Sequence, residues 1–281
     1  MAPVTWIRGS GLVAAVLLAG QSLAQSCQGA PPTRFDIRMS EGYSSQLIMN
    51  GLSKPRGIAT DSQGNLLVVE SGGAGVRHVK LTESGGSVCV QSSKQLIDDK
   101  ETANTSMCPG GHGVFQYEYD AIAGTASNRK LVVTDLRNPG TSGHYARSLW
   151  VSHANPDLLL VHRGSLGNID VDASKAETGR SVIRYFNISE IAQKAQPHAT
   201  GGGLLAMGVR NTVAFGENIA KGEFWSVDNS IDNMQRFGAQ VHNDNPAEEL
   251  NFHGKIEPGN KLLGGNFGYP TCVTARRLDT L

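Results

Sequence analysis

The chain has 281 residues, and its 25 lysine and arginine residues balance its 25 aspartate and glutamate residues. A nucleic-acid partner requires a clustered basic face, and the absence of any run of Lys or Arg excludes this class of partner. A chain of this size can bury a sizeable core, either as one large all-β domain or as two smaller ones.

The N-terminus has the pattern of a secretory signal peptide. Arg8 precedes an uncharged apolar run at Gly11–Ala19, and Ser22 and Ala24 supply the small residues that signal peptidase requires. We therefore predict a signal peptide at residues 1–24, a mature domain at 25–281 and an extracellular location. The apolar run is too short to span a bilayer, so no membrane partner is expected.

The cysteines and sequons fit an exported protein. The four cysteines allow three disulfide pairings, and none forms a CxxC motif, so zinc binding and thiol redox chemistry are not expected. They are Cys27, Cys89, Cys108 and Cys272. The sequons at Asn104 and Asn187 predict surface glycosylation.

The remaining sequence predicts short strands separated by turns. Glycine is plentiful, at 34 residues, and only Ile188–Lys194 has helical character. Short β-branched and aromatic runs between Gly, Asn, Asp and Pro clusters are typical of strands. Such runs occur at Gln46–Met49, Leu66–Val69, Val76–Val79, Lys130–Val133, Ser148–Val151, Leu158–Val161, Ser181–Tyr185 and Gly222–Ser226.

One unit, a strand, a polar turn and a second strand, recurs along the chain. It begins near Arg56, near Arg147 and near Arg210, at intervals close to the blade-sized periods of β-propellers. A propeller blade cannot bury both of its faces alone, so several blades must stack around an axis. The pattern favours an all-β propeller, and a β-sandwich stays open because short alternating strands do not fix the topology.

Three polar clusters lie between the strand units. His144, in a Gly/Ser loop, could act as a general base or could be a surface histidine. Arg210 offers a planar set of donors for a carboxylate beside the amide of Asn211, although it could equally pair with an aspartate. The oxygen-rich loop around Asn243 and Asp244 suits Ca²⁺ or is merely solvated.

These clusters and their order resemble the soluble quinoprotein glucose/sorbosone dehydrogenases, most closely the fungal pyrroloquinoline quinone (PQQ)-dependent pyranose dehydrogenases. The resemblance covers most of the chain from about Gln46 onward. The segments that carry it are Pro55–Ile58, Gly64–Val68, Gly143–His144 with Arg147, Arg163–Asp170, Gly179–Val182, Gly208–Asn211, Trp225–Asn229, His242–Asn251 and Gly264–Pro270.

The resemblance implies a fold, two cofactors and a set of roles. The family forms a six-bladed propeller with PQQ on its axis, of which this chain would supply about four blades. His144 matches the base that takes the proton of a sugar hydroxyl while hydride passes to the quinone. Arg210 and Asn211 match contacts to PQQ, and Arg56 is a weaker candidate for a second cationic contact. Asn243 and Asp244 match the segment that holds an active-site Ca²⁺.

Two departures from the family pattern predict impaired activity. The chain ends soon after Gly264–Pro270, where family members continue, and the segment from Asp99 to Phe115 leaves little room for an expected strand pair. We therefore expect an incomplete propeller with exposed strand edges and weak or absent turnover.

The leading hypothesis is a secreted dehydrogenase of pyranoses or sorbosone-like 2-keto sugars with an unknown electron acceptor. A Ca²⁺-dependent propeller lactonase would share the acidic loop and the histidine but would not need Arg210 near a polyanionic cofactor. A non-catalytic propeller remnant is the third alternative. A PQQ titration separates the first two, and a fully active His144→Ala variant would count against the dehydrogenase mechanism.

Overall fold

A computed structural model describes residues 35–70, 75–84, 86–98, 113–136, 143–144, 147–236, 238–241 and 247–274. These residues are mostly β-sheet, and the expected helix is present as α2 (Ile188–Gln193), the one α-helix in these ranges. The predicted signal peptide and the sequon at Asn104 lie outside the described residues. Among the described helices, none has the length and apolar character needed to cross a membrane.

The first predicted unit forms an antiparallel sheet. Its strands follow in chain order: β1 (Pro55–Thr60), β2 (Leu66–Glu70), β3 (Gly75–Ser84) and β4 (Ser87–Ile97). Asp61 forms the polar turn after β1 by accepting the backbone N–H groups of Gln63 at 2.9 Å and Asn65 at 2.8 Å. Asp61 also accepts a 2.6 Å hydrogen bond from the Tyr119 hydroxyl, which ties this sheet to the next.

The strand expected at Gln46–Met49 is absent. A side chain replaces the backbone pairing there, because the Gln46 amide donates to the Val88 carbonyl at 2.7 Å and accepts from the Val88 N–H at 3.2 Å. Ile48 and Met49 instead line a cavity against the first sheet. The apolar residues of this segment are therefore placed by packing and not by a strand ladder.

A second sheet joins distant parts of the sequence. Its strands, in spatial order, are β10 (Gln196–Pro197), β6 (Thr125–Thr134) and β5 (Val114–Asp120). The prediction placed a strand only at Lys130–Val133, whereas β6 already begins at Thr125. The earlier start follows from a turn in which the Asp120 carboxylate accepts the N–H groups of Ile122 and Ala123, both at 2.9 Å.

The central sheet has a deeply buried strand in its interior. In spatial order it contains β17 (Gly265–Asn266), β11 (Gly203–Met207), β9 (Val182–Asn187), β8 (Leu158–Arg163) and β7 (Leu149–Val151). Successive side chains of a strand point to opposite faces. Leu159 and Val161 of β8 accordingly pack in one core cluster and Leu158 and Leu160 in another. This explains the continuous apolar run in the sequence of β8.

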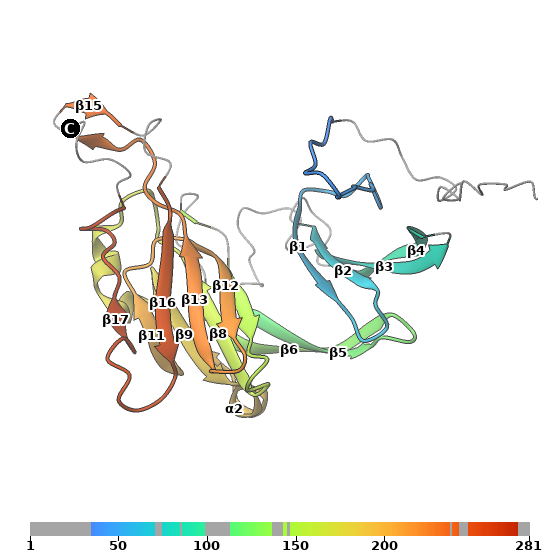
Figure 1. The fold of residues 1–281 in the computed structure, drawn as a ribbon. Coiled ribbons are helices and arrows are strands. Elements are labelled where there is room, and N and C mark those ends of the chain that lie inside the picture. Colours follow the sequence, from blue (N-terminus) through green and yellow to red (C-terminus); the bar gives the residue numbers. More distant parts are fainter. Residues whose placement is uncertain are drawn as a thin grey trace, which may run out of the picture.

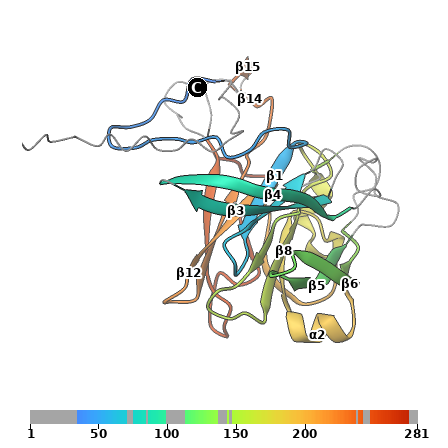
Figure 2. The ribbon, with the colours of Figure 1, turned by 90° about the vertical axis from the view of Figure 1, so that its right-hand side faces the viewer.

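The third repeat of the unit forms another antiparallel sheet. Its strands are β12 (Thr212–Asn218), β13 (Glu223–Asp228) and β16 (Glu249–Lys255), and β14 (Gln235–Arg236) pairs separately with β15 (Ala239–Gln240). This sheet and the central sheet stand together in one body, whereas the sheet of β1 to β4 lies apart, on the side of β5 and β6 (Figures 1 and 2). All three predicted strand–turn–strand units are therefore present as antiparallel pairs.

The cysteines differ in state. Cys89 on β4 is disulfide-bonded, whereas Cys272 is free and exposed. The other two cysteines, Cys27 and Cys108, lie outside the described residues.

Candidate functional site

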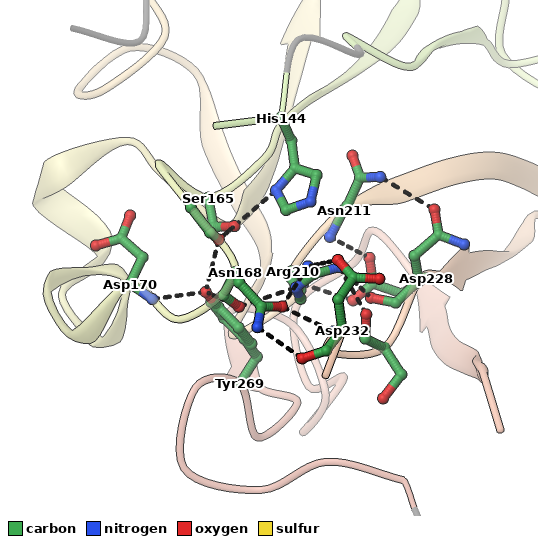
Figure 3. A network of polar contacts seen from close by, with 12 residues as sticks. His144, Ser165, Asn168, Asp170, Arg210, Asn211, Asp228, Asp232 and Tyr269 are labelled. Atoms are coloured by element: carbon green, nitrogen blue, oxygen red, sulfur yellow. Dashed lines mark hydrogen bonds and ion pairs between the residues drawn. The ribbon is translucent and has the colours of Figure 1, made fainter. Parts of the chain in front are cut away.

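The connections at one end of the central and third sheets carry a dense network of polar side chains (Figure 3). His144 precedes β7, Ser165 follows β8, Arg210 lies between β11 and β12, and Asp232 follows β13. Tyr269 follows β17 and completes the set. Strand ends from two sheets therefore deliver side chains to one place, although these residues are widely separated in the sequence.

His144 is held by Ser165 through both backbone and side chain. The His144 backbone N–H donates to the Ser165 carbonyl at 3.0 Å, and the His144 Nδ1 atom lies 2.8 Å from the Ser165 Oγ atom. Arg147 supports the same residue, because its Nη1 donates to the His144 carbonyl at 2.7 Å. The histidine is half-buried and fixed in orientation.

Gly164 lets His144, Arg210 and Asn211 come together. A Cβ atom at this glycine would lie 2.7 Å from the His144 Cβ, 3.2 Å from the Arg210 carbonyl oxygen and 3.4 Å from the Asn211 Oδ1. Any larger residue would therefore separate these groups. The family resemblance implies that His144, Arg210 and Asn211 lie around one cofactor, and in the structure they surround one glycine.

The guanidinium of Arg210 is buried, with 4% of its side chain exposed, and it is fully engaged. It donates from Nε to the Asn168 carbonyl at 3.0 Å and from Nη1 to the Ser230 carbonyl at 2.6 Å. Its Nη2 donates at 2.8 Å both to the Asn168 Oδ1 and to the Asp232 carboxylate. The Asp232 side chain is 64% exposed, so the pair joins a buried cation to an accessible anion.

Asp228 fixes the backbone of the Arg210–Asn211 turn. Its two carboxylate oxygens each accept a 2.6 Å hydrogen bond, one from the Arg210 N–H and one from the Asn211 N–H. Burial, aided by the charge of Glu249, raises the pKa of Asp228 to about 7, although the two N–H donors act in the opposite direction. Asp228 is thus a structural support of the site that sequence reasoning did not identify.

One polar atom of the Asn211 side chain has a hydrogen-bond partner, and the other has none. Its Nδ2 donates to the Asn229 Oδ1 at 3.0 Å, whereas its Oδ1 is buried and receives no hydrogen bond. Buried polar atoms in proteins almost always have a partner. Asn211 therefore retains one unused acceptor, enclosed beside Gly164.

The surroundings of His144 favour its neutral form. Burial lowers the pKa of His144 below the ordinary value of 6.5, and the positive charges of Arg210 and Arg147 lower it further. The nearby Ser165 backbone and the charge of Asp232 oppose this shift in part. At neutral pH the imidazole is therefore mostly uncharged, as a general base requires.

The segment Ser165–Asp170 is held in place by Tyr269 and Arg180. The Tyr269 hydroxyl accepts the Asp170 N–H at 2.7 Å and donates to the Asn168 carbonyl at 3.2 Å. Arg180 pairs with the Asp170 carboxylate at 2.7 Å, which anchors the far end of the segment. The sequence motifs around Asn168 and Tyr269 were part of the family resemblance, but nothing in their spacing revealed these roles.

Of the other predicted site residues, Arg56 lies in the described part of the chain. Arg56 is exposed on β1, where it lines a cavity of about 340 Å³ whose other walls are mostly apolar, and no described contact joins it to His144 or Arg210. Asn243 and Asp244 lie outside the described residues, so the calcium prediction is not tested there. Within the described ranges, no three His, Cys, Asp or Glu side chains gather in a way that could hold a metal ion.

The remaining described histidines do not join the site. His162, His198 and His253 are fully buried, and burial lowers the pKa of both His198 and His253 to about 4. They are therefore neutral at physiological pH. Such burial is typical of structural histidines.

The chain is similar to known proteins over most of its length. Residues 37–281 match the family model described as TrAA12-like. The chain is 37% identical over 273 residues to a pyrroloquinoline quinone-dependent sugar dehydrogenase of Hypocrea jecorina (strain QM6a), which covers 92% of this chain and 62% of that protein. The chain thus spans about three fifths of the length of this curated relative.

Two solved structures are similar to the whole described fold. A calcium structure of the Trichoderma reesei Carbohydrate-Active Enzymes Family AA12 protein matches with a TM-score of 0.75 and 36% identity, over 86% of this chain and 62% of that one. The holo form of the pyranose dehydrogenase PQQ domain from Coprinopsis cinerea matches with a TM-score of 0.73 and 33% identity, over 89% and 62%. On the match of residues 37–281 to the family model, this chain belongs to the TrAA12-like family.

Proposed function

We propose that this protein is a PQQ-dependent dehydrogenase of pyranoses or sorbosone-like 2-keto sugars. The observation that carries the proposal is that a neutral histidine meets the backbone of a buried arginine at Gly164 and is influenced by the charge of that arginine, in a chain whose relatives are named for PQQ-dependent sugar oxidation. We also propose that the sheets are blades of a propeller, which the likeness to the solved PQQ domain supports.

The donor set at the site fits a tricarboxylate quinone. Arg210 supplies a fixed positive charge in a partly dry environment, where charge-assisted hydrogen bonds are strong. The adjacent Asn211 contributes an Oδ1 acceptor without a hydrogen-bond partner. All Arg210 donors are engaged, however, so a carboxylate of the cofactor would have to displace the exposed Asp232.

In the proposed reaction, PQQ supplies the two-electron acceptor when it is bound. His144 takes the proton of the sugar hydroxyl, because it is neutral and fixed by Ser165. Arg210 binds a negatively charged group of the cofactor. Together with burial, the larger cause, its positive charge lowers the pKa of His144. Arg56 is proposed as a weaker second cationic contact, and the Asn243–Asp244 loop as the Ca²⁺ site.

We further propose that the turnover of this chain is weak. Every residue of the edge strand β1 is exposed, and Ile58 on it is 68% exposed, which leaves part of the first sheet without packing. Contacts made by the rest of a longer relative could cover this surface. Robust turnover by the purified chain with PQQ, Ca²⁺ and an artificial acceptor would contradict this part of the proposal.

The cofactor proposal is tested by titrating the purified chain with PQQ in the presence of Ca²⁺ and following the cofactor absorbance. Arg210→Ala should weaken PQQ binding by about 100-fold, because hydrogen bonds to charged groups contribute about 1.5–3 kcal/mol each. Asp232→Asn should strengthen it by about 2- to 5-fold, because the competing exposed ion pair is worth about 0.2–1 kcal/mol.

Opposite shifts in these two variants would support the proposed cofactor site. Equal titration curves for wild type, Arg210→Ala and Asp232→Asn would overturn it. Ca²⁺-dependent lactone hydrolysis without PQQ binding would favour the hydrolase alternative. Thermal unfolding of each variant controls for loss of fold, since Arg210 is buried.

We also propose that the protein is secreted and that Asn187 is glycosylated. Asn187 is exposed at the junction of β9 and α2, where its Nδ2 donates to the Glu190 carboxylate at 2.9 Å. The side chain is therefore accessible to a glycosyltransferase. Mass spectrometry of protein secreted from a fungal host, before and after glycosidase treatment, tests both points.

A further inference from the structure

The hydroxyl of Ser165 sits between the imidazole of His144 and a backbone carbonyl. The Ser165 Oγ lies 2.8 Å from the His144 Nδ1 and 2.7 Å from the Gly167 carbonyl oxygen (Figure 3). Ser165 is fully buried, so water does not compete for these contacts. The inference below rests on the proposed function, since it assigns a role toward the same base.

Counting protons determines the tautomer of His144. A carbonyl oxygen only accepts hydrogen bonds, so the contact with Gly167 directs the Ser165 hydroxyl proton away from His144, and the hydrogen bond between the Ser165 side chain and Tyr269 gives that proton no reason to turn back. The Ser165 Oγ must then accept from His144, which places the imidazole proton on Nδ1. In a neutral imidazole the other nitrogen, Nε2, is left as the proton acceptor.

The position of Ser165 is itself fixed on both sides. Its N–H donates to the Arg210 carbonyl at 3.0 Å, and its carbonyl accepts the His144 N–H at 3.0 Å. The segment that follows is anchored by Tyr269 and by the Asp170–Arg180 ion pair. The Ser165 backbone is therefore fixed, which keeps its hydroxyl beside the His144 imidazole.

We propose that Ser165 is a positioning residue that holds His144 as its Nδ1–H tautomer, with Nε2 directed to the proton of the sugar hydroxyl. When the substrate is oxidised, this proton moves to Nε2 and the hydrogen on the same carbon leaves with its electron pair to bound PQQ. The Nδ1–H bond to Ser165 persists in the imidazolium. A neutral orienting group, unlike a carboxylate, adds no charge that would make His144 a stronger base.

The tautomer is read directly by ¹⁵N NMR of histidine-labelled protein at pH 7.5, with His144→Gln used to assign the ring signals. Wild type should show His144 protonated on Nδ1, and Ser165→Ala should show a mixture of the two tautomers. This readout does not depend on PQQ or on turnover. A negative NMR result would therefore overturn the tautomer assignment alone, whereas the PQQ titration tests the proposed function.

Kinetics provide the second readout. Ser165→Ala should slow single-turnover reduction of PQQ by about 10-fold, which corresponds to about 1.4 kcal/mol, with PQQ affinity unchanged within about twofold. Ser165→Thr, which keeps the hydroxyl, should restore the Nδ1–H tautomer. Ser181→Ala is the matched control, because Ser181 is also fully buried but its hydroxyl has no hydrogen-bond partner.

Two results would overturn the inference. One is a wild-type His144 protonated mainly on Nε2. The other is a Ser165→Ala variant that keeps the Nδ1–H tautomer and the wild-type rate. A Ser165→Ala protein with the wild-type unfolding temperature and a mixed tautomer would support it.

Discussion

The sheet of β1 to β4 and the two sheets formed by β7 to β9, β11 to β13, β16 and β17 hold their candidate cofactor-binding arginines in opposite ways. Arg56, on the first sheet, is exposed beside an apolar cavity. Arg210, between β11 and β12, is buried and donates to Asn168, Ser230 and Asp232. Arg56 is thus solvated, whereas Arg210 is held in a fixed direction.

The difference follows from how the strands pack. Every residue of β1 is exposed, whereas every residue of β8 is buried. Connections that follow a buried strand begin from a fixed point, and burial strengthens the electrostatic interactions of the groups they carry. Groups whose function needs a fixed geometry are therefore expected at the ends of the buried strands. Substitutions there should have larger effects than substitutions on β1.

The largest expected effect is at His144. His144→Gln should slow single-turnover reduction of PQQ by about 1000-fold, within the usual range for loss of a general base. PQQ affinity should be unchanged. His153→Gln, at an exposed histidine outside the network, is the control and should have no effect.

The pH profile sharpens this prediction. Because the pKa of His144 is lowered below 6.5, the base stays neutral as the pH falls to that value. The acid limb of the rate should therefore lie below pH 6.5, with activity lost as His144 becomes protonated. An acid limb above pH 6.5, or one that persists in His144→Gln, would contradict the assignment.

An intermediate effect is expected at Gly164. Gly164→Ala places a Cβ 2.7 Å from the His144 Cβ and 3.2 Å from the Arg210 carbonyl, neither of which is a flexible end. Overpacking of this kind costs about 1–3 kcal/mol, so the unfolding temperature should fall and PQQ binding should weaken. Gly167→Ala has no heavy atom within 4 Å of the added Cβ and should unfold like wild type. Equal unfolding temperatures for the two variants would show that the close packing around Gly164 is not required.

The smallest effect is expected at Arg56. Arg56→Ala should change PQQ affinity by less than about twofold, because an exposed cation contributes little. The measurement is the same PQQ titration used for Arg210→Ala. A loss as large as that of Arg210→Ala would break the contrast between the two regions and would contradict the weaker role proposed for Arg56.

Much of the β-structure was predictable because it depends on local pattern. The hairpin around Asp61 and the pair β12–β13 follow from turn residues between apolar runs. Gln46–Met49 was mispredicted because an apolar run also suits a segment that packs without a ladder, here held by the Gln46 side chain. Periodicity cannot distinguish these two outcomes.

The candidate site was only partly predictable. His144, Arg210 and Asn211 were named from their residue types and from motifs that resemble a family. Ser165 and Asp228 were not named, since a buried serine and aspartate next to a strand look like ordinary core-edge residues in sequence. Their roles depend on contacts between segments that are distant in the chain.

The sequence by itself determined the mostly β character, the three strand–turn–strand units and the chemical identity of the candidate base and cation, because these depend on side chains and short-range turn propensities. The tertiary structure alone decided that His144, Arg210 and Asn211 meet at Gly164, that Ser165 directs the imidazole and that Asp232 faces Arg210. Such contacts are set by the packing of separate sheets, and the direction of a hydrogen bond exists only once both partners are in place.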